Sequence, residues 1–482
     1  MNFQIPWNVY QSNYRYKYLA LYHALRDAIV GGGLPYGCKL PSSRDLADMY
    51  VISRGIVSQV YEMLVAEGYL VSGVGSGTYV SFNLHQSMTA GEPSSPIHLS
   101  EWGWRLDQVP LPEVRPTSLS HIRWDFTIGH TDGKAFPISL WNRALYRAVR
   151  EGSARQREEA FFAQGHLPLR EAIAKHLSRT RGIPVVADDV VIVNGSMQAI
   201  ALLAQLLVNP GEQVVMEDPG YRGIRQAVSA AGGEPVAGRV DDRGMVPEDW
   251  EARLLFVTAS RQFPTGAVLS LERRQELLNW AVKRNAVIVE DDYDSEFRHK
   301  GRPIEPLKLL DTSGRVVYIG TFSKTLFSDI RIGYVVLPPW LRAPFCKAKY
   351  LYEPHPTGLT QQHALADFMN SGQYERHLRR MKRIYSKKHA LCRQELQQRL
   401  GSWFEFVESD AGLHVFGWWK GSGEQYESYR MACREAGIVW SDAGSYIIDT
   451  GKKGACFGFA HLAEEEIVVG IRQMAELAVR SE

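Results

Sequence analysis

The residue with the clearest chemical potential is Lys324, in the run GRVVYIGTFSKTLFSDIRIGYVVLP. It follows a predicted strand, with the hydroxyl residues Thr321 and Ser323 just before it and Arg331 seven residues after it. A lysine amine can hold an aldehyde as a Schiff base, and hydroxyls with a guanidinium can hold a phosphate. The segment therefore predicts an anchor for a phosphorylated aldehyde.

Acidic residues cluster in a second run, AVIVEDDYDSEF, where Glu290, Asp291 and Asp292 follow one another before Tyr293. This cluster also comes at the carboxyl end of a predicted strand. Grouped carboxylates can hold a metal ion, but no His or Cys accompanies them, so we predict no metal site. A solvated acidic loop is the simplest alternative.

Two further loops carry residues suited to a flat, phosphorylated ligand. VVIVNGSMQAIALLAQLL predicts a strand, a turn and a helix start, which gives Gly195, Ser196 and Met197 the backbone donors that favour phosphate. VVMEDPGYRG places Tyr221 beyond a strand, where its ring could stack on the ligand, although such a turn is often only structural. The run TASRQFPTG follows another strand. Because ligands of open α/β sheets bind beyond the carboxyl ends of the strands, these loops predict one crevice.

The elements that must position these residues alternate along the chain. From about Arg123 onward, helical patterns alternate with β-branched runs such as VVIVNG, EQVVMED, RLLFVTAS and AVIVEDDY. This alternation predicts a mostly parallel sheet with helices on both faces. The stretch after about Tyr350 is helical and then mixed, which predicts a smaller C-terminal α+β lobe.

The first part of the chain has a different pattern, and we predict three regions: residues 1–82, a linker over 83–122 and a large domain over 123–482. Short helical patterns begin after Ser42 and Ser53, and YLVSGVGSGTYV predicts a hairpin. Helix, helix-turn-helix and hairpin is the order of a winged helix, which presents the second helix of the pair to a DNA major groove. The linker is rich in Ser and Pro and lacks a sustained period.

Charge gives the DNA-binding prediction little support. Residues 1–82 hold six Lys or Arg against five Asp or Glu, and the whole chain of 482 residues has a formal charge of +2. Nucleic-acid contacts must therefore come from locally placed residues. A small helical interaction domain remains the alternative at this point.

Composition is that of an ordinary globular protein, with 45% hydrophobic and 22% charged residues. The five cysteines are scattered and form no C-x-x-C pair, which predicts a reducing compartment without a disulfide or zinc framework. No apolar run approaches the ~20 residues needed to cross a bilayer, and no signal peptide is evident. We expect a cytoplasmic protein that does not associate with membranes.

The N-terminal motifs LPSSRDLA, SR, LVAEGYL and GSGTYV resemble the winged-helix domain of the GntR family of bacterial regulators. The resemblance implies that a double-stranded DNA operator is contacted by Arg44, Ser53, Arg54, Gly75 and Gly77. Arg54 would be best placed for a bidentate bond to guanine, and the glycines would let the wing approach the DNA backbone or minor groove. Ile56 stands where the family usually has Thr.

The ordered motifs of the large domain resemble the fold-type I aminotransferases, which use pyridoxal 5′-phosphate (PLP), over roughly residues 123–478. The resemblance implies that Lys324 forms the Schiff base, that Tyr293 bonds the ring hydroxyl and that Tyr221 stacks on the ring. It implies that Asp291 pairs with the pyridine nitrogen, although Glu290 and Asp292 stay open as alternatives. The phosphate would be held by Gly195, Ser196, Met197, Thr321, Ser323 and Arg331.

The motifs EDPGY, QFPTG, EDDYDSEF and IGTFSKTLF further resemble the MocR (GabR-like) subfamily, in which a GntR-type winged helix is fused to such a domain. Phe263, within QFPTG, stands where aminotransferases commonly place an Asn near the ring hydroxyl. One position departs from the subfamily pattern. Cys456, in GACFGFAHLAEEEI, stands where an arginine binds the substrate carboxylate, and a thiol cannot replace a guanidinium. Arg222, Arg225 and His414 are the candidates to replace it.

The resemblance implies a homodimeric, PLP-dependent transcriptional regulator rather than an enzyme. Because Cys456 removes the carboxylate contact, we expect the regulator to sense PLP itself and to control vitamin B6 synthesis, as some members of the subfamily do. A regulator that senses an amino acid or amine through an external aldimine is the alternative. An active aminotransferase with a fused DNA-binding domain fits less well, although residual half-transamination would need little beyond the cofactor. Lys324 argues against a large domain that only dimerises.

Overall fold

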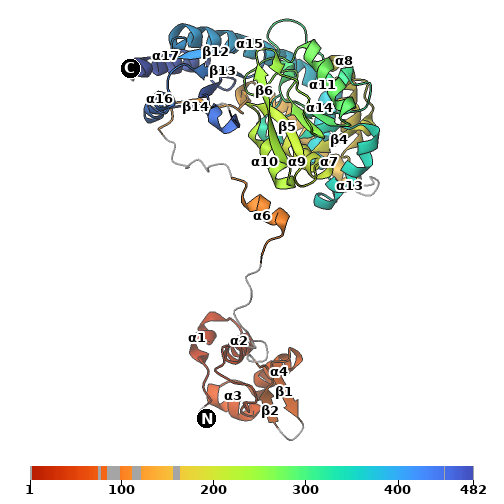
Figure 1. Ribbon diagram of the computed structural model, residues 1–482. Helices are drawn as coiled ribbons and strands as arrows, with labels where there is room; N and C mark the ends of the chain where they lie inside the picture. Colours follow the sequence, from red (N-terminus) through yellow and green to blue (C-terminus); the bar gives the residue numbers. More distant parts are fainter. Residues whose placement is uncertain are drawn as a thin grey trace. The chain divides into compact units, whose positions relative to one another are not determined.

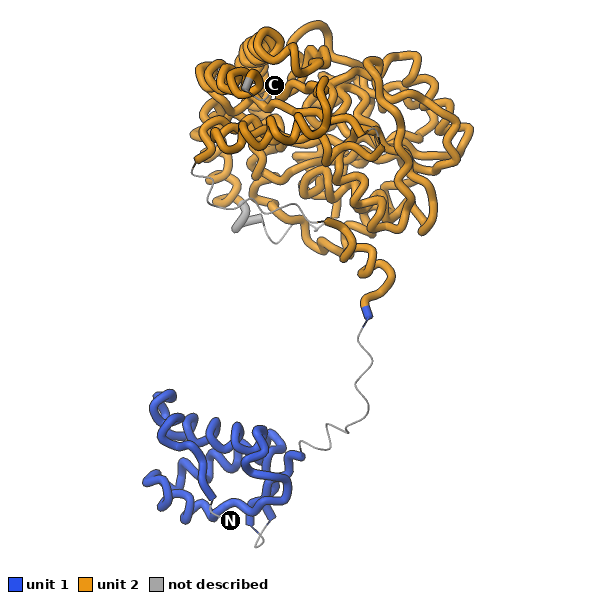
Figure 2. The backbone as a smooth tube through the Cα atoms, turned by 60° about the vertical axis from the view of Figure 1, so that its left-hand side comes forward, with its two compact units in different colours: residues 1–98 blue, residues 99–482 orange. Residues whose placement is uncertain are grey.

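The computed structural model describes residues 3–73, 77–83, 98–110, 121–155, 163–449 and 451–480. The chain divides into two compact units, Met1–His98 and Leu99–Glu482 (Figure 2). Among the described residues, no helix is both long and apolar enough to cross a membrane.

The first unit is a winged helix, as the sequence predicts (Figure 1). Its elements are α1 Trp7–Asn13, α2 Lys17–Val30, α3 Ser43–Tyr50, α4 Arg54–Ala66, β1 Leu70–Gly73 and β2 Gly77–Val80. Ser42 and Ser53 cap α3 and α4, since each hydroxyl accepts a hydrogen bond from the backbone N–H three residues later. The two strands pair antiparallel, with Leu70 opposite Val80. The wing and both helices therefore share one small core.

The centre of the second unit is an eight-stranded sheet in the order β4-β11-β10-β9-β8-β5-β6-β7. Its strands are β4 Val190–Val193, β5 Gln213–Asp218, β6 Glu234–Asp241, β7 Gly244–Met245, β8 Leu254–Val257, β9 Val287–Asp292, β10 Val316–Thr321 and β11 Gly333–Val336. The strands from β10 through β9, β8 and β5 to β6 are parallel, whereas β11 and β7 run antiparallel to their neighbours. The carboxyl ends of β5, β8, β9 and β10 therefore lie on one edge.

Helices cover both faces of this sheet, as predicted (Figure 1). They are α7 Ile138–Arg155, α8 Leu167–Arg181, α9 Ser196–Leu207, α10 Arg222–Ala231, α11 Leu271–Lys283, α12 Leu307–Leu310, α13 Pro339–Tyr352 and α14 Leu359–Asn370. The alternation of β4 explains the two layers, because successive side chains of a strand point to opposite faces. Val190 and Ile192 pack in a cluster with α7, α8 and α14, whereas Val191 and Val193 pack with α9, α10 and α13.

The C-terminal part forms the predicted smaller α+β lobe. Its sheet has the order β12-β13-β15-β14-β3, with β3 Trp124–Phe126, β12 Phe404–Phe406, β13 His414–Trp419, β14 Ile438–Asp442 and β15 Gly454–Gly458. Its helices are α15 Gln373–Leu400, α16 Gly423–Glu435 and α17 Glu464–Arg480. Strand β3 comes from the start of the large domain and pairs parallel with β14. The lobe therefore combines segments from both ends of the large domain's sequence.

A short helix, α6 Glu101–Asp107, lies within the stretch that the sequence predicts as linker. We did not predict this helix. Its Arg105 donates from Nε to the main-chain oxygen of Ala230 in α10 at 3.3 Å. Three residues after α6, the carbonyl of Pro110 accepts a hydrogen bond of 2.6 Å from Arg222. This part of the chain therefore packs against α10 of the large domain.

Candidate functional site

Lys324 lies in the loop between β10 and β11, at the edge where the parallel strands end. Its Nζ donates to the main-chain oxygen of Gly129 at 3.4 Å, and Ser328 donates to the same oxygen at 3.0 Å. Burial of the amine lowers the pKa of Lys324, while the carboxylates of Asp294 and Asp291 act in the opposite direction. A lysine with a lowered pKa is more often neutral and is therefore a better nucleophile for an aldehyde.

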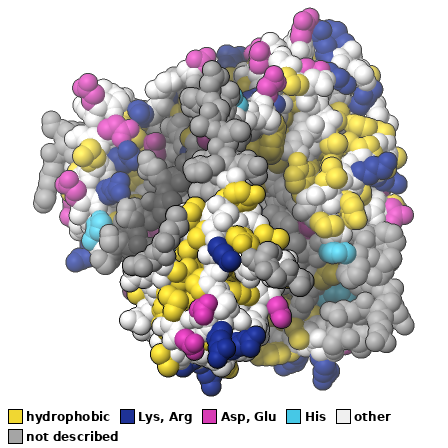
Figure 3. Space-filling model, turned by 90° about the horizontal axis from the view of Figure 1, so that it is seen from below, with side chains coloured by type: hydrophobic (Ala, Val, Ile, Leu, Met, Phe, Trp, Pro, Cys, Tyr) yellow, Lys and Arg dark blue, Asp and Glu magenta, His cyan; other side chains and the backbone are white. Residues whose placement is uncertain are grey.

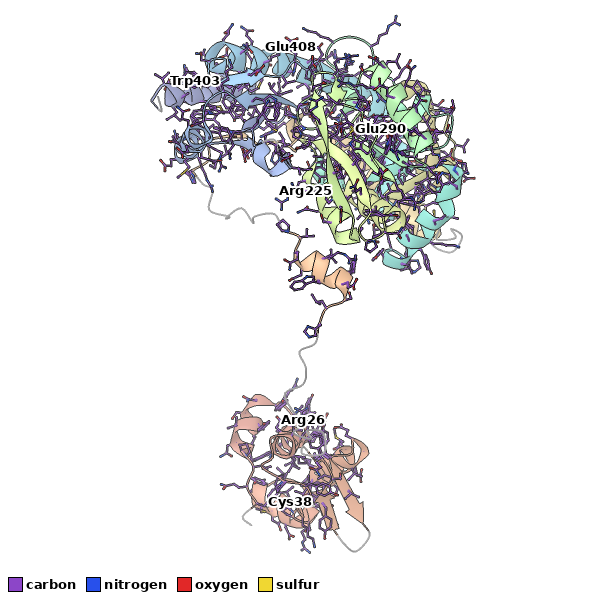
Figure 4. The ribbon with its side chains drawn as sticks, in the orientation of Figure 1. Arg26, Cys38, Arg225, Glu290, Trp403 and Glu408 are labelled. Atoms are coloured by element: carbon purple, nitrogen blue, oxygen red, sulfur yellow. The ribbon has the colours of Figure 1, made fainter. Side chains whose placement is uncertain are left out.

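Two of the three adjacent acids of β9 are engaged away from Lys324. Glu290 accepts hydrogen bonds of 2.8 Å from the backbone N–H groups of Leu307 and Lys308 at the start of α12, and Figure 4 shows it inside the large domain. Asp292 forms a buried ion pair of 2.6 Å with Arg181. Both side chains therefore have structural partners.

Asp291 differs from its two neighbours because it points to the other face of the strand. Its Oδ1 is buried without a hydrogen-bond partner among the described residues. Burial, followed by repulsion from Asp292 and Asp294, raises the pKa of Asp291 to about 7, and Lys324 opposes that shift. Of the three adjacent acids, Asp291 is thus the one with an oxygen left to bind a donor, such as the protonated nitrogen of a ring.

A second group of residues surrounds the start of α9. Gly195 precedes this helix with φ +82°, and a Cβ there would lie 2.6 Å from Nη2 of Arg331. Only glycine fits this close approach and this conformation. Arg331 donates to the main-chain oxygen of Asn194 at 3.1 Å, while Ser196 and Met197 open the helix with N–H groups that have no acceptor within it. These groups form a positive end suited to a phosphate.

Two predicted hydroxyl residues lie in the neighbouring β10 loop. The backbone N–H of Ser323 donates to Thr321 Oγ1 at 3.2 Å. The hydroxyl of Ser323 is buried and has no hydrogen-bond partner among the described residues. An orphaned buried hydroxyl costs free energy unless a ligand or water satisfies it, so this side chain also fits a bound phosphate.

Aromatic rings line the middle of the site around Phe263. Its ring makes edge contacts with Tyr446 at 5.0 Å, Tyr293 at 5.7 Å and Tyr221 at 5.9 Å between ring centroids. His414 lies 6.1 Å away on a further side. The structure therefore brings Tyr221 and Tyr293, predicted from separate loops, against one apolar ring.

Sequence reasoning missed Arg261, which is buried in the loop after β8. Its Nη1 donates to the hydroxyl of Tyr293 at 2.7 Å and to the carboxylate of Asp294 at 3.2 Å. Its Nε donates to the carbonyl of Ala411 at 3.0 Å and its Nη2 to that of His414 at 3.1 Å. The only signal in the sequence is a charged residue in a strand-end loop, since the partners at 411 and 414 are far along the chain.

Cys456 lies in β15 and is fully buried. It packs in a small cluster with Phe416 and Ala443. Burial raises the pKa of its thiol far above the usual range. The side chain is therefore an uncharged, apolar wall of the site.

The three candidates to replace a carboxylate-binding arginine have other partners. Arg222 donates to the carbonyl of Pro110 at 2.6 Å. Arg225, a residue of α10 that Figure 4 labels, donates to the carbonyl of Ile447 at 3.3 Å. His414 is buried, and burial lowers its pKa well below the usual range, so its ring is neutral. No group of three or more acids, His or Cys suited to a metal ion occurs in the part of the chain that the structure describes.

Four of the five predicted DNA-contacting residues are described, and they lie in α3, at the start of α4 and at the start of β2. Arg44 in α3, Ser53 and Arg54 at the start of α4 are exposed, and Arg54 Nε donates to the hydroxyl of Ser43 at 3.4 Å. Gly77 begins β2 with φ +102°, which only glycine adopts readily.

Gly75, also predicted to contact DNA, lies outside the described residues. The face drawn in Figure 3 carries Lys and Arg among Asp and Glu, without one large field of a single sign. This mixed surface agrees with the small net charge, so DNA contacts depend on individual side chains.

Comparisons with known proteins match both units. Residues 17–80 match the family "Bacterial regulatory proteins, gntR family", and residues 128–450 match "Aminotransferase class I and II". The probable rhizopine catabolism regulatory protein MocR of Rhizobium meliloti is 36% identical over 478 residues, which cover 96% of this chain and 94% of that protein. The HTH-type pyridoxine biosynthesis transcriptional regulator PdxR of Corynebacterium glutamicum is 31% identical over 376 residues, with 77% of each chain covered.

Solved structures resemble the large domain. The Pyrococcus horikoshii kynurenine aminotransferase, determined with PMP, substrate and product, aligns with a TM-score of 0.69 at 25% identity. The alignment covers 76% of this chain and 95% of the aminotransferase.

Proposed function

The chain belongs to the MocR subfamily of gntR-type transcriptional regulators, and from this premise we propose that its aminotransferase-like domain binds PLP and senses it. The observation that carries the proposal is the buried, unpartnered oxygen of Asp291 on the same strand-end edge as Lys324. A buried carboxylate without a donor is costly in a structural role and suits a site completed by a ligand.

Different residues of the site would bind different parts of the cofactor. PLP supplies an aldehyde and an electron-withdrawing pyridine ring when bound. Lys324 offers its amine to the aldehyde, and Asp291 holds a proton at the ring nitrogen. Tyr221 stacks on the ring face, and Tyr293 donates its hydroxyl proton to the ring hydroxyl oxygen.

The phosphate binds at the start of α9. Gly195 would allow the phosphate a close approach, and the N–H groups of Ser196 and Met197 at the start of α9 would donate to it. The hydroxyls of Thr321 and Ser323 and the guanidinium of Arg331 complete this cradle, and each lies in the segment that begins at the end of β10.

We propose that PLP itself is the effector and that the protein controls vitamin B6 synthesis. Support comes from Cys456, which offers no charge to a carboxylate, and from the partners that already engage Arg222 and Arg225. The relative named for pyridoxine biosynthesis agrees with this choice. A small amino compound is the second candidate, favoured by the 36% identity to a regulator named for rhizopine catabolism.

On the DNA side, Arg54 reads a guanine, while Arg44, Ser53 and the wing glycines contact the backbone. We propose that the protein acts as a homodimer, because winged helices usually read paired half-sites. Exposed Tyr350, Leu351 and Tyr352 at the end of α13 offer apolar surface to a partner subunit. We propose that the protein is a cytoplasmic regulator rather than an enzyme, because Arg222 and Arg225 are already engaged and Cys456 carries no charge for a substrate carboxylate.

One experiment separates the effectors. Operator affinity is measured with the protein stripped of PLP, with PLP restored, and with PLP plus a panel of amino acids and amines. PLP sensing requires a change of affinity on PLP addition alone, because a ligand shifts an equilibrium only through differential affinity for its two states. An affinity indifferent to PLP but responsive to one amino compound would favour the second candidate.

A further inference from the structure

Arg261 is a buried arginine of the site that donates hydrogen bonds from all three of its guanidinium nitrogens. We propose that Arg261 is a positioning residue that directs the hydroxyl proton of Tyr293 toward the bound cofactor. This inference rests on the proposed binding of PLP.

The contacts of Arg261 fix its orientation. Its Nε and Nη2 donate to the carbonyls of Ala411 and His414, so two bonds hold the guanidinium against the β13 side of the site. Nη1 then faces Tyr293 and Asp294. A Cβ on Gly412, which has φ +89°, would collide with this guanidinium, so only glycine at this position leaves room for the arginine.

In the hydrogen bond between Arg261 and Tyr293, only the arginine can be the donor. A guanidinium has N–H donors and no acceptor, so at this 2.7 Å contact the phenol oxygen accepts. The hydroxyl of Tyr293 makes no other hydrogen bond to the described residues, and its ring packs against the apolar edge of Phe263. The proton of Tyr293 therefore remains available to an acceptor in the site, which is the ring oxygen of PLP.

Arg261 acts through Tyr293 rather than as a free charge. The side chains of Arg261 and Asp294 are each only 2% exposed and pair at 3.2 Å, so the arginine charge is largely neutralised. Arg261 donates to four acceptors inside the protein, namely Tyr293, Asp294 and the carbonyls of Ala411 and His414, so the guanidinium is engaged without an effector. A phenol that accepts a charge-assisted bond becomes a stronger donor in turn. Arg261 thus compensates for the Asn that aminotransferases commonly place at the position of Phe263.

This arrangement predicts a measurable property of the bound cofactor. A stronger donor at the ring oxygen stabilises negative charge there and weakens proton binding at the neighbouring nitrogen of the lysine–cofactor linkage. The titratable groups that face Tyr293 and Lys324 are Arg261, Asp294, Asp291, Glu217 from β5 and His414 from β13. Of these, Arg261 alone donates to the Tyr293 hydroxyl.

The test is a pH titration of the visible absorbance of the PLP-loaded, full-length protein. Arg261→Met should raise the midpoint by about one pH unit, the size expected for one lost hydrogen bond. Because Arg261→Met leaves Asp294 buried and unpaired, a second comparison uses proteins that all carry Asp294→Asn. The midpoint of the double variant Arg261→Met/Asp294→Asn should be about one pH unit above that of Asp294→Asn alone.

Two controls make the result specific. In a Tyr293→Phe background, Arg261→Met should cause no further shift, since the residue through which it acts is gone. Arg274→Met removes another buried arginine, whose guanidinium donates to the main-chain oxygens of Leu269 and Ala259, and should leave the midpoint unchanged. Unchanged midpoints in both Arg261→Met comparisons, or an undiminished shift without the Tyr293 hydroxyl, would overturn the inference. A wild-type protein that forms no visible band would instead refute the proposed PLP binding.

Discussion

Asp291→Asn should stabilise the cofactor-free protein while weakening its affinity for PLP. In the free protein, burial first and the nearby Asp292 and Asp294 second raise the pKa of this carboxyl from 3.8 to about 7. The folded protein binds this proton more tightly than the unfolded chain does. As the pH rises from about 4 to about 7, the acid therefore lowers the free energy of unfolding by an increasing amount.

A pKa raised from 3.8 to about 7 lowers the free energy of unfolding by ~4 kcal/mol above pH 7 and by only about 2 kcal/mol at pH 5. Asparagine has a similar shape and cannot ionise. The stability advantage of Asp291→Asn over the wild type should therefore widen by about 2–3 kcal/mol between pH 5 and pH 8. PLP affinity should fall about 10-fold to 150-fold, because the variant loses a charged hydrogen bond worth about 1.5–3 kcal/mol.

Urea unfolding of the cofactor-free proteins at both pH values measures the first effect, and equilibrium titration with PLP measures the second. Asp292→Asn is the matched control, because it removes the partner of buried Arg181 and should destabilise the protein at both pH values. The reasoning fails if Asp291→Asn gives no stability advantage at pH 8, or if the variant binds PLP as tightly as the wild type.

The remaining predictions concern the lysine, the DNA contact, the carboxylate position and the helix before the large domain. Lys324→Ala should abolish the adduct that borohydride fixes between protein and PLP and leave the circular dichroism spectrum unchanged; mass spectrometry that still finds a covalent adduct would contradict the assignment. Arg54→Ala should cost about 1–3 kcal/mol of operator affinity at fixed salt without changing PLP binding, and an unchanged affinity would place base recognition elsewhere. Cys456→Arg should increase the spectral response of the PLP-bound protein to amino acids, because it restores a guanidinium to the site; an equal response in both proteins would refute the importance of this position. Arg222→Ala with Gln226→Ala removes both hydrogen bonds to the carbonyl of Pro110 and should speed proteolysis near α6, whereas an unchanged cleavage rate would show that these bonds do not hold the segment.

Sequence patterns predicted the loops of the site because a parallel sheet brings its strand ends to one edge. The β-branched runs before Gly195, Tyr221, Tyr293 and Lys324 were enough to place these residues at strand ends. The pattern could not reveal Arg261, whose position depends on carbonyls at 411 and 414, about 150 residues further along the chain. Such contacts arise from tertiary packing and leave no periodic signal.

The helix α6 escaped prediction for a related reason. It has only seven residues, and isolated helices of that length are unstable in water. It is held by contacts outside itself, including the bond from Arg105 to α10. Trp102, Trp104 and Leu106 remain exposed, so the segment lacks the buried apolar stripe by which surface helices are usually recognised.

The three adjacent acids of β9 differ in their hydrogen-bond partners because a strand turns successive side chains to opposite faces. Glu290 and Asp292 share one face, where the start of α12 and Arg181 satisfy them. Of the three, only Asp291 lies on the face of Lys324, and its Oδ1 has no hydrogen-bond partner among the described residues. A one-residue shift of register would exchange these faces, burying two unpaired carboxylates beside the lysine and leaving Arg181 without its partner. The choice of Asp291 as the proposed cofactor-binding acid therefore depends on the register of β9 against β8 and β10, and not on the acidic composition of the motif.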